Sequence, residues 1–356
     1  MPGRKRVGVL TFHRCINYGA YWQARCLVEA LRSQQHDAVL LDHRSWRVDL
    51  REWTWGLRPV SPEFIPPLDF FRYAGKEWAF FRAAARLPRS RPFRLEQPAT
   101  MEEFDVVLVG SDEVWSPKHA WYGDCPIFYG AGVRTKCLAA YGASFGGHCA
   151  SEGLDAARSG WLRAFDSISV RDENSRSLVR AVTGRDVAVV LDPCLQFPVD
   201  PDPVRHVPDG PYVALYGYRF STPFARHVQS WARRNGLRTI SIGYRNDWAD
   251  VNWLSAGPNE FAHCMGGAQV VATNFFHGCV FALRHAKPFV CEMLTKRSIK
   301  VQELMRTVGA ESHLMTLESS AAVYEEQLER PMDATIMRRI DDLRGVSAAY
   351  LQGVLK

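Results

Sequence analysis

The sequence lacks the cysteine spacing of a disulfide-stabilised or zinc-binding protein. Its 9 cysteines are odd in number, scattered, and never arranged as a CxxC pair. This excludes a regular disulfide framework and favours free thiols in a reducing compartment. Long apolar runs are also missing. No uncharged stretch approaches the ~20 residues that span a bilayer, and the apolar run before Thr11 is too short for a signal peptide. We therefore expect a cytoplasmic protein.

A strong charge of either sign is lacking as well. The 356 residues carry a net charge of +6, and 23% of them are charged. This mild basic excess suits an anionic small molecule, a sugar nucleotide or a membrane surface as well as nucleic acid, so it selects no partner by itself. The 47% hydrophobic content is enough to fill the cores of two domains.

Short apolar runs alternate with helical stripes, the pattern of βαβ units in a mostly parallel sheet. A helix is expected where Ala20, Ala24, Leu27 and Leu31 share one face, and another at 173–183, where Gly184 would end it. Strands are expected at 7–12, 38–42, 105–110, 138–145, 167–170 and 187–192, and then at 212–218, 239–244, 269–274 and 288–292. The predicted fold is α/β, with two Rossmann-like doubly wound domains facing a cleft.

The segment 198–211 separates the two series of strands. It carries five prolines among polar residues, and we interpret it as the linker and hinge between domains. The predicted organisation is an N-terminal domain at 1–197, a C-terminal domain at 212–330, and a C-terminal helix within 331–356.

Residues 44–100 show no clear strand pattern and form an insertion in the first domain. Tryptophans and arginines are frequent there: Trp46, Trp53, Trp55 and Trp78, with Arg82, Arg86, Arg89, Arg91 and Arg94. One interpretation is a set of short helices whose aromatic side chains pack on the first domain. The other is a lid, or a basic aromatic face that meets an anionic lipid-linked acceptor or a membrane surface. Nucleic acid is not expected as a partner, because only the arginine-rich segment would support it.

Several polar residues follow the expected strands, at the sheet edge where doubly wound domains bind ligands. They are Asn17 and Gly19 after the first strand, Ser111 and Asp112 in "VGSDEVW", Ser144 in "GASFG", and Arg171 in "SVRDENS". Each has a structural and a functional interpretation. Asp112 would cap a helix or orient a reacting group. Arg171 would pair with Asp172 at a helix start, or clamp a carboxylate or phosphate.

The stretch "VVATNFFHGCVFALRHAKPFV" (270–290) raises the same question at the end of a strand in the second domain. A strand gives way to a helix at Asn274, and an imidazole and a glycine, His277 and Gly278, stand at the transition. Arg284 follows on the same expected helix. A packed turn is the structural interpretation, and an acid–base group beside a helix N-terminus is the functional one.

Taken together and in this order, these motifs resemble the polysaccharide pyruvyl transferase family. The motifs are the early "NYGA" with Gln23, "DVVLVGSDEVW", "YGASFG", "SVRDENS", "VVLDP" and "TNFFHG…FAL…KPF", so the resemblance covers most of the chain. It implies a two-domain architecture of the glycosyltransferase-B kind. It also implies transfer of the enolpyruvyl unit of phosphoenolpyruvate to a sugar or glycan acceptor, which is nucleotide- or lipid-linked in one version of this hypothesis. A pyruvate ketal would form and phosphate would leave.

The resemblance also assigns roles. His277 matches the histidine expected to act as acid or base, and Asp112 would position a hydroxyl or the imidazole. Arg171 would hold phosphate or carboxylate, and the amides at the helix start beside Gly278 would face the leaving phosphate. Asn17, Gly19, Ser111, Ser144, Asn274 and Arg284 complete the predicted substrate-binding set. Neither a metal nor another cofactor is required by this chemistry.

Three departures from the family pattern keep other interpretations open. Phe275 stands where an arginine or serine is common, Cys279 where threonine is common, and Glu113 where glutamine is common. Loss of the arginine would leave Arg284, Lys287 or Arg171 to compensate. The alternatives are a transferase of the same fold with a different donor or acceptor, such as a sugar nucleotide or a small natural product, and a non-catalytic binding or scaffolding member.

Overall fold

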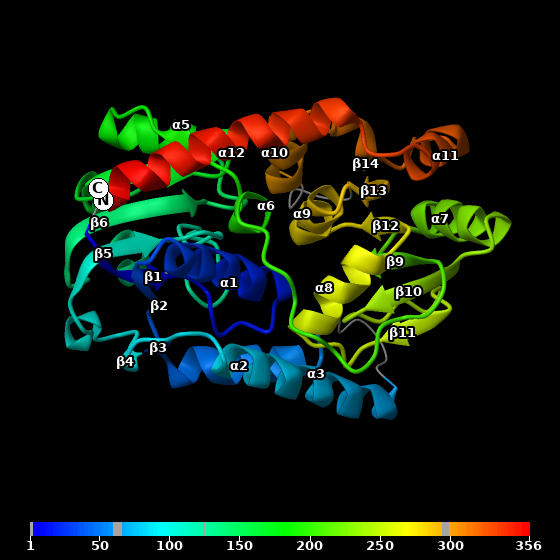
Figure 1. Ribbon diagram of the computed structural model, residues 1–356, viewed down its shortest axis with the longest axis horizontal. Coiled ribbons are helices and arrows are strands. Elements are labelled where there is room, and N and C mark those ends of the chain that lie inside the picture. The colour runs from blue at the N-terminus through cyan, green and yellow to red at the C-terminus, as the bar shows by residue number, and fades with distance from the viewer. Residues whose placement is uncertain (1–2, 60–65, 124, 294–298) are drawn as a thin grey trace. The chain divides into compact units, whose positions relative to one another are not determined.

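The computed structural model describes residues 3–59, 66–123, 125–293 and 299–356, and the chain divides into two units (Figure 1). The first unit comprises Met1–Glu52, Arg86–Val199 and Ile340–Lys356, and the second comprises Trp53–Ala85 and Asp200–Arg339. Each unit is built around its own parallel sheet.

The first unit contains a sheet in which every neighbouring pair of strands is parallel. Its order is β2 (Asp37–Leu40), β1 (Arg6–Leu10), β5 (Phe104–Val109), β6 (Thr135–Ala143), β7 (Ser167–Val170) and β8 (Ala188–Val189). These strands confirm the predicted ones, with shifts of a few residues at their ends. The two-residue strands β3 (His43–Arg44) and β4 (Phe93–Arg94) pair separately.

Helices cover both faces of this sheet. They are α1 (Tyr18–Ser33), α4 (Ala156–Arg163), α5 (Glu173–Thr183), the short α6 (Pro193–Gln196) and the end of α12 (Ala334–Leu355). Between them lie the 3-10 turns η1 (Pro98–Thr100), η2 (Pro126–Tyr129) and η3 (Ala150–Glu152). The bounds of α5 are those expected, because Asp172 caps its first turn and Gly184 ends it in the left-handed conformation (φ 70°).

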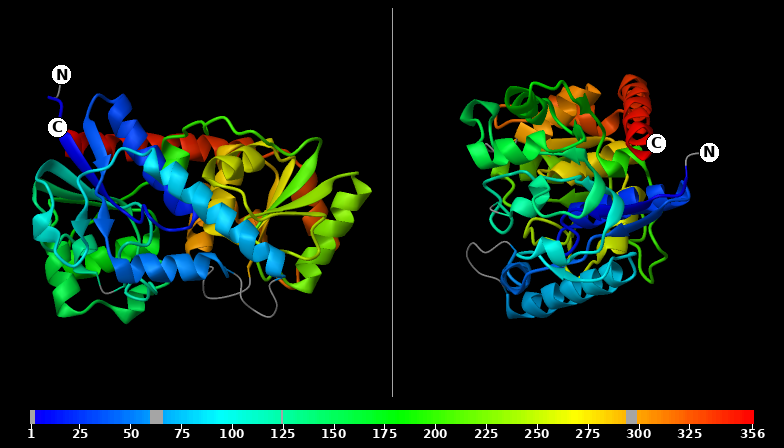
Figure 2. Two further views of the ribbon diagram at one scale, coloured as in Figure 1. Left: turned by 90° about the horizontal axis from the view of Figure 1, so that it is seen from below. Right: turned by 90° about the vertical axis from the view of Figure 1, so that its left-hand side faces the viewer.

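The second unit repeats the plan, again with all neighbouring strands parallel. The order is β11 (Val251–Trp253), β10 (Arg238–Ile242), β9 (Tyr212–Tyr216), β12 (Val270–Thr273), β13 (Phe289–Glu292) and β14 (Leu314–Met315). Helices α7 (Thr222–Arg234) and α11 (Ala321–Glu329) share a buried core with one face of this sheet. On the other face are α8 (Pro258–Gly267) and α9 (Phe276–Arg284), as Figure 2 shows. The unit also holds α10 (Ile299–Val308) and the turn η5 (Glu311–His313).

The insertion is helical, as predicted, but its main helix does not pack where we expected. It forms α2 (Trp46–Gly56) and α3 (Pro67–Ala85), whereas 60–65 lie outside the described residues. Instead of joining the first unit, α3 packs on the second. Two polar contacts explain this placement. The Lys76 ammonium donates to the Gly243 carbonyl at 2.9 Å, and the Asp69 carboxylate accepts from Arg245 at 2.6 Å.

The division between the units falls between Val199 and Asp200, inside the segment predicted as a linker. The segment beyond it contacts α8, since Asp202 exchanges hydrogen bonds with Asn259. The C-terminal helix extends over most of the predicted tail, and its part from Ile340 onward belongs to the first unit. Among the described helices, none combines the length and the apolar character needed to cross a bilayer.

Candidate active site

The strand order of the first sheet reverses between β1 and β5. Doubly wound sheets bind ligands at the carboxyl ends of the strands that flank such a reversal. Asn17 and Gly19 follow β1, and Ser111 and Asp112 follow β5. The topology therefore brings two of the predicted motifs to one edge of the first sheet.

Asn17 is the N-cap of α1. Its Oδ1 accepts from the backbone N–H of Gly19 at 2.8 Å and of Ala20 at 3.2 Å. This satisfies two amides that the first turn of a helix leaves without partners. The structural interpretation of this motif is confirmed, and a contact of Asn17 or Gly19 with substrate stays a prediction.

Thr11, which we did not predict, links the two strands at the reversal. Its hydroxyl donates to the Ser111 carbonyl at 2.8 Å and accepts from the Gln23 side-chain amide at 2.7 Å. The Ser111 hydroxyl in turn donates to the Gly142 carbonyl at 2.9 Å, and the Ser111 side chain is fully buried. Ser111 therefore stabilises this edge of the sheet, and Gln23 of the "NYGA…Q" motif stabilises it as well through its bond to Thr11.

Arg171 lies between two carboxylates. Its Nη2 is 3.4 Å from Asp112 Oδ1, and its Nη1 is 3.4 Å from Asp192 Oδ2. Burial of the guanidinium disfavours its charged form, but the carboxylates of Asp112 and Asp192 outweigh this effect and raise the pKa of Arg171. Asp192 was not among the predicted site residues, although it follows an apolar strand as Asp112 does. The arrangement is a buried cation held at the carboxyl edge by two acids.

Of the two aspartates considered as helix caps, Asp112 and Asp172, only the second is one. Asp112 begins no helix. Its φ is 92°, and its Oδ1 accepts the N–H of Glu113 at 2.8 Å besides the contact to Arg171. Asp172 is the residue that caps a helix, since its Oδ1 accepts the N–H of Ser175 at 2.7 Å. Arg171 and Asp172 therefore have different partners: Arg171 bonds to the acids at the sheet edge, and Asp172 bonds to the first turn of α5.

Ser144 is also engaged in the fold. Its hydroxyl donates to Asp172 Oδ2 at 2.6 Å and accepts the N–H of Gly146 at 3.0 Å. These bonds tie the "GASFG" turn to the start of α5. The tight-packing interpretation of this turn is confirmed, and phosphate binding by Ser144 stays a prediction.

A second buried cluster near the end of β1 was missed from the sequence. The Cys15 thiol hydrogen-bonds to Glu52 and to Tyr122. Burial, together with the Glu52 carboxylate, raises the pKa of Cys15 well above its usual value, and burial raises the pKa of Glu52 as well. A thiol held protonated is a poor nucleophile, so covalent catalysis through Cys15 is not supported. No sequence signal separates Cys15 from the other eight cysteines.

Asp42, just after β2, pairs with two arginines and a histidine. Its carboxylate contacts His13 at 3.2 Å, Arg14 at 3.3 Å and Arg44 at 3.0 Å. Burial alone would raise the pKa of Asp42, but the hydrogen bonds from His13 and Arg44 outweigh it, and the pKa lies below its usual range. The available signal was an acid as the last residue of the expected strand 38–42.

The second sheet reverses its order between β9 and β12. Asn274 follows β12, and its Nδ2 donates to the carbonyl of Tyr218 after β9 at 2.8 Å, which joins the two strand ends. His277 lies in the first turn of α9 and is buried, with its ring edge-on to Phe276 at 5.1 Å between centroids. The fold therefore places the predicted acid–base residue at the reversal of the second sheet.

Gly278 and Arg284 lie at opposite ends of α9, and a contact of either with substrate stays a prediction. A side chain at position 278 would collide with the hydroxyl and Cβ of Thr273, so Gly278 lets α9 approach β12 closely. Arg284 is in the last turn of α9, about 10 Å along the helix from His277 at 1.5 Å per residue. Its guanidinium lies over the Phe281 ring at 5.5 Å. The structure does not bring Arg284 to the helix start.

Phe275 belongs to an aromatic cluster at the same edge. Its ring centroid lies 4.9 Å from that of Tyr216, 5.5 Å from Tyr218 and 5.2 Å from Tyr244. Arg219 follows Tyr218 in the chain, and its guanidinium lies 5.8 Å from the Tyr218 ring. Arg219 is exposed and lies in the loop after β9. It was not predicted, and its place after a strand is the signal that would have found it.

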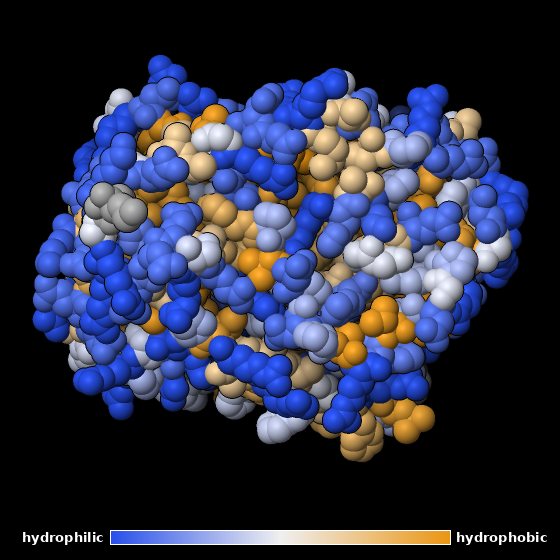
Figure 3. All heavy atoms as spheres, in the orientation of Figure 1, coloured by the Kyte–Doolittle hydropathy of each residue, from blue (hydrophilic) through white to orange (hydrophobic). Residues whose placement is uncertain are grey.

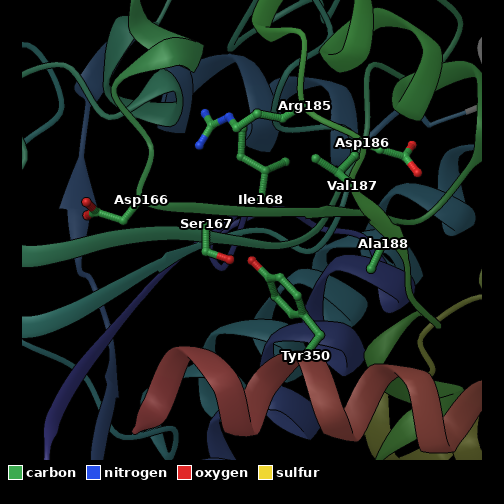
Figure 4. A pocket seen from close by; sticks show the side chains of 8 residues that line it. All are labelled: Asp166, Ser167, Ile168, Arg185, Asp186, Val187, Ala188 and Tyr350. Atoms are coloured by element: carbon green, nitrogen blue, oxygen red, sulfur yellow. The ribbon is translucent and has the colours of Figure 1, made fainter.

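A pocket of about 260 Å³ lies at the opposite edge of the first sheet (Figure 4). Ser167 begins β7 and Ala188 begins β8, so this pocket faces the amino ends of the strands. Its polar groups already have partners: Arg185 donates to the carbonyls of Phe165 and Leu162, and the Tyr350 hydroxyl donates to Ala140. We therefore place the candidate site at the carboxyl edges and not in this pocket.

A solved structure with a TM-score of 0.50 confirms the fold class. The chain is similar to a UDP-GlcNAc 2-epimerase from Neisseria meningitidis bound to UDP-GlcNAc, with 12% identity, a TM-score of 0.50, and coverage of 98% of this chain and 99% of that one. It is also similar to a glycosyltransferase from a Streptomyces species in complex with thymidine diphosphate, with 12% identity, a TM-score of 0.48, and coverage of 97% and 96%. At such identities the likeness shows the fold alone: two Rossmann-like units of the glycosyltransferase-B kind.

The family follows from a separate comparison. The family model for polysaccharide pyruvyl transferase matches residues 17–292, well over half of the chain. The chain therefore belongs to the polysaccharide pyruvyl transferase family, and it is an enzyme of that family. The match covers Asn17, Asp112, Arg171 and His277. No protein with a curated function matches the chain significantly.

Proposed function

We propose that this enzyme transfers the pyruvyl unit of phosphoenolpyruvate to two hydroxyls of a sugar in a cell-surface glycan or its precursor. The observation that carries the proposal is family membership over 17–292, with His277 in the first turn of α9 at the reversal of the second sheet. An imidazole suits this chemistry because it exchanges protons near neutral pH.

The reaction balances as follows. A proton is added to the methylene carbon of phosphoenolpyruvate, which becomes a methyl group and leaves the neighbouring carbon electrophilic. Two sugar hydroxyls form bonds to that carbon, while its bond to the phosphate oxygen breaks. One hydroxyl proton replaces the proton given to the methylene carbon, and the other leaves with phosphate. His277 would carry the proton in these steps, and the first-turn amides of α9 would face the departing anion.

The anionic donor also needs a cation. Arg284, at the far end of α9, is badly placed for this role, and Phe275 has replaced the arginine common in the family. Arg219 is exposed, follows β9 at the reversal and lies beside Tyr218. We assign donor recognition in the second unit to Arg219, with a bidentate contact to phosphate or carboxylate.

A turnover assay that measures phosphate release tests the role of His277. His277→Ala should lower kcat by a factor on the order of 100 or more, while its melting temperature stays close to that of the wild type. His285→Ala is the matched control, because His285 caps the other end of α9, and it should retain most of the activity. Equal activity in the two variants would remove His277 from the mechanism.

Calorimetry with phosphoenolpyruvate tests the role of Arg219. Arg219→Ala should weaken binding at least about tenfold, as loss of a charge-assisted hydrogen bond does, whereas Arg284→Ala should bind normally. The reverse result would restore the original prediction for Arg284.

The cluster of Phe275 with three tyrosines favours one second candidate, a transferase whose donor is a sugar nucleotide. Aromatic rings at a carboxyl edge suit the face of a base or sugar better than a phosphate. Saturable binding of a sugar nucleotide, with no phosphoenolpyruvate signal and no phosphate release, would select this candidate over the first.

A further inference from the structure

Helix α3 buries charged side chains and exposes large aromatic ones. Asp69 and Lys76 are only 1% exposed, whereas Phe71 is 71% exposed and Trp78 is 64% exposed. A surface helix normally turns its charged side outward and its apolar side to the core. Tyr73 and Phe80 are buried on the inner side of α3, so Phe71 and Trp78 are aromatic side chains in excess of those that its packing uses.

The inner side of α3 explains why the charged side chains are buried. Small residues bring it close to the loops after β10 and β11: Gly75 meets Ser255, and Ala79 meets Gly257. Lys76 adds its bond to the Gly243 carbonyl and lies over the Tyr244 ring at 4.5 Å, and Asp69 pairs with Arg245. Together with the buried rings of Tyr73 and Phe80, these residues fill the contact, and Phe71 and Trp78 lie on the other side of the helix.

The outward aromatic face consists of exposed residues on α3 and at the end of α2. They are Trp53, Leu68, Phe70, Phe71, Trp78 and Phe81. Phe71, Trp78 and Phe81 follow one another at helical spacing and so share one side of α3. The Trp53 and Phe81 rings meet edge to face at 5.6 Å, which joins the end of α2 to this face. In Figure 3, some apolar residues lie at the lower right, near one end of α3 in Figure 1, among hydrophilic ones.

The exposed charges on α3 itself are of one sign. The exposed charged residues of α3 are Arg72 and Arg82, because its acids, Asp69 and Glu77, are buried. Two copies of the helix packed face to face would bring arginines together with no exposed acid on α3 to pair with them. Exposed tryptophan and phenylalanine flanked by arginine is the composition of a helix that lies in a lipid headgroup layer.

We propose that the outward aromatic face docks on an anionic membrane surface, with α3 lying in the plane of the headgroups. The aromatic rings enter the layer between headgroups and acyl chains, and Arg82 pairs with lipid phosphates. This surface is independent of the proposed chemistry, since none of its residues belongs to the candidate active site. A membrane-bound enzyme would meet a lipid-linked acceptor in the plane where that acceptor lies.

Co-sedimentation of the full chain with vesicles tests the proposal without turnover. Wild-type protein should bind phosphatidylcholine vesicles that contain phosphatidylglycerol more tightly than phosphatidylcholine alone, and high salt should weaken the binding. The double variant Phe71→Ser with Trp78→Ser should lose at least about tenfold in affinity. Arg82→Gln should lose about fivefold on anionic vesicles, the effect of one basic residue near such a surface.

The matched control is Leu317→Ser with Val346→Ser. Leu317 is 65% exposed and Val346 47%, and neither lies on α3. This variant should bind as the wild type does. Equal binding by the two double variants, or equal binding to both lipid mixtures, would overturn the proposal. A third result would also overturn it: the wild type binds no vesicles and is a dimer in sedimentation velocity, whereas Phe71→Ser with Trp78→Ser is a monomer. The outward aromatic face would then pack against a second copy of the chain.

Discussion

At the scale of single residues, Gly278 packs against Thr273 in the same turn of α9 that contains His277. The Thr273 hydroxyl donates to the Tyr216 carbonyl at 2.5 Å, so this side chain is fixed where a Cβ on residue 278 would have to go. Gly278→Ala should lower the free energy of unfolding by about 1–3 kcal/mol, the usual cost of overpacking a core.

The control for this substitution is another helical glycine. Gly345 of α12 is exposed, and a Cβ there would meet no atom within 4 Å. Gly345→Ala should raise the free energy of unfolding by up to about 1 kcal/mol, because alanine loses less backbone entropy on folding. Urea denaturation of both variants measures the two changes in the free energy of unfolding, which should be opposite in sign. A Gly278→Ala protein as stable as the wild type would mean that α9 can move away from β12 at little cost.

The sequence predicted which residues stand at the sheet edges but not what they bond to. Asn17, Ser111 and Ser144 each follow a strand, which periodicity can locate. Periodicity does not predict their hydrogen-bond partners. Ser111 donates to Gly142, and Ser144 donates to Asp172, contacts that exist only once neighbouring strands are paired. Asp192 was missed for the same reason: it follows β8, and it contacts Arg171, which follows the neighbouring strand β7.

At the scale of elements, local patterns sufficed for most strands and for the ends of α5, but not for α3. An apolar stripe normally marks the buried side of a helix, but α3 has apolar side chains on both sides: Tyr73 and Phe80 are buried, whereas Phe71 and Trp78 are exposed. The burial of Lys76 depends on Gly243 and Tyr244, which are far away in sequence. The packing of such a helix could not be derived from its own residues.

The buried Lys76 makes a prediction about pH. Burial lowers the pKa of Lys76 to about 7, although Glu77 acts in the opposite direction, and an exposed lysine titrates near 10.5. Between these values the unfolded chain holds the extra proton, so Lys76 makes stability increase as pH rises from about 7 toward 10.5. The slope is at most about 1.4 kcal/mol per pH unit.

Denaturation of Lys76→Met across this range isolates the effect, because the other titrating groups are common to both proteins. The free energy of unfolding of the wild type, minus that of Lys76→Met, should increase with pH. Lys136→Met is the control. Lys136 is exposed and Asp105 raises its pKa, so its difference curve should stay flat below pH 10. Parallel curves for Lys76→Met and the wild type would show that Lys76 keeps an ordinary pKa.

At the scale of the whole molecule, the two units are not two consecutive stretches of chain. The last part of α12 returns to the first unit, where the Ser347 hydroxyl accepts the Leu191 N–H at 2.9 Å and the Tyr350 hydroxyl donates to the Ala140 carbonyl at 2.8 Å. Leu351 and Leu355 are buried there as well. A fragment ending near the predicted boundary at 197 would lack this cover, so we do not expect it to fold as well as the first unit does in the full chain.

Deletion of 340–356 therefore should destabilise the first unit selectively. Each buried leucine or isoleucine it removes contributes about 1.5–3 kcal/mol, and the bonds to Leu191 and Ala140 are lost with them. Hydrogen exchange gives the measurement, because the amides of β6 and β7 should lose protection while those of β9 and β12 act as an internal control. Equal loss in both sheets would mean that the units unfold together. Unchanged exchange in β6 and β7 would mean that the end of α12 adds little to the first unit, although Ile340 and Leu351 are buried in the full chain.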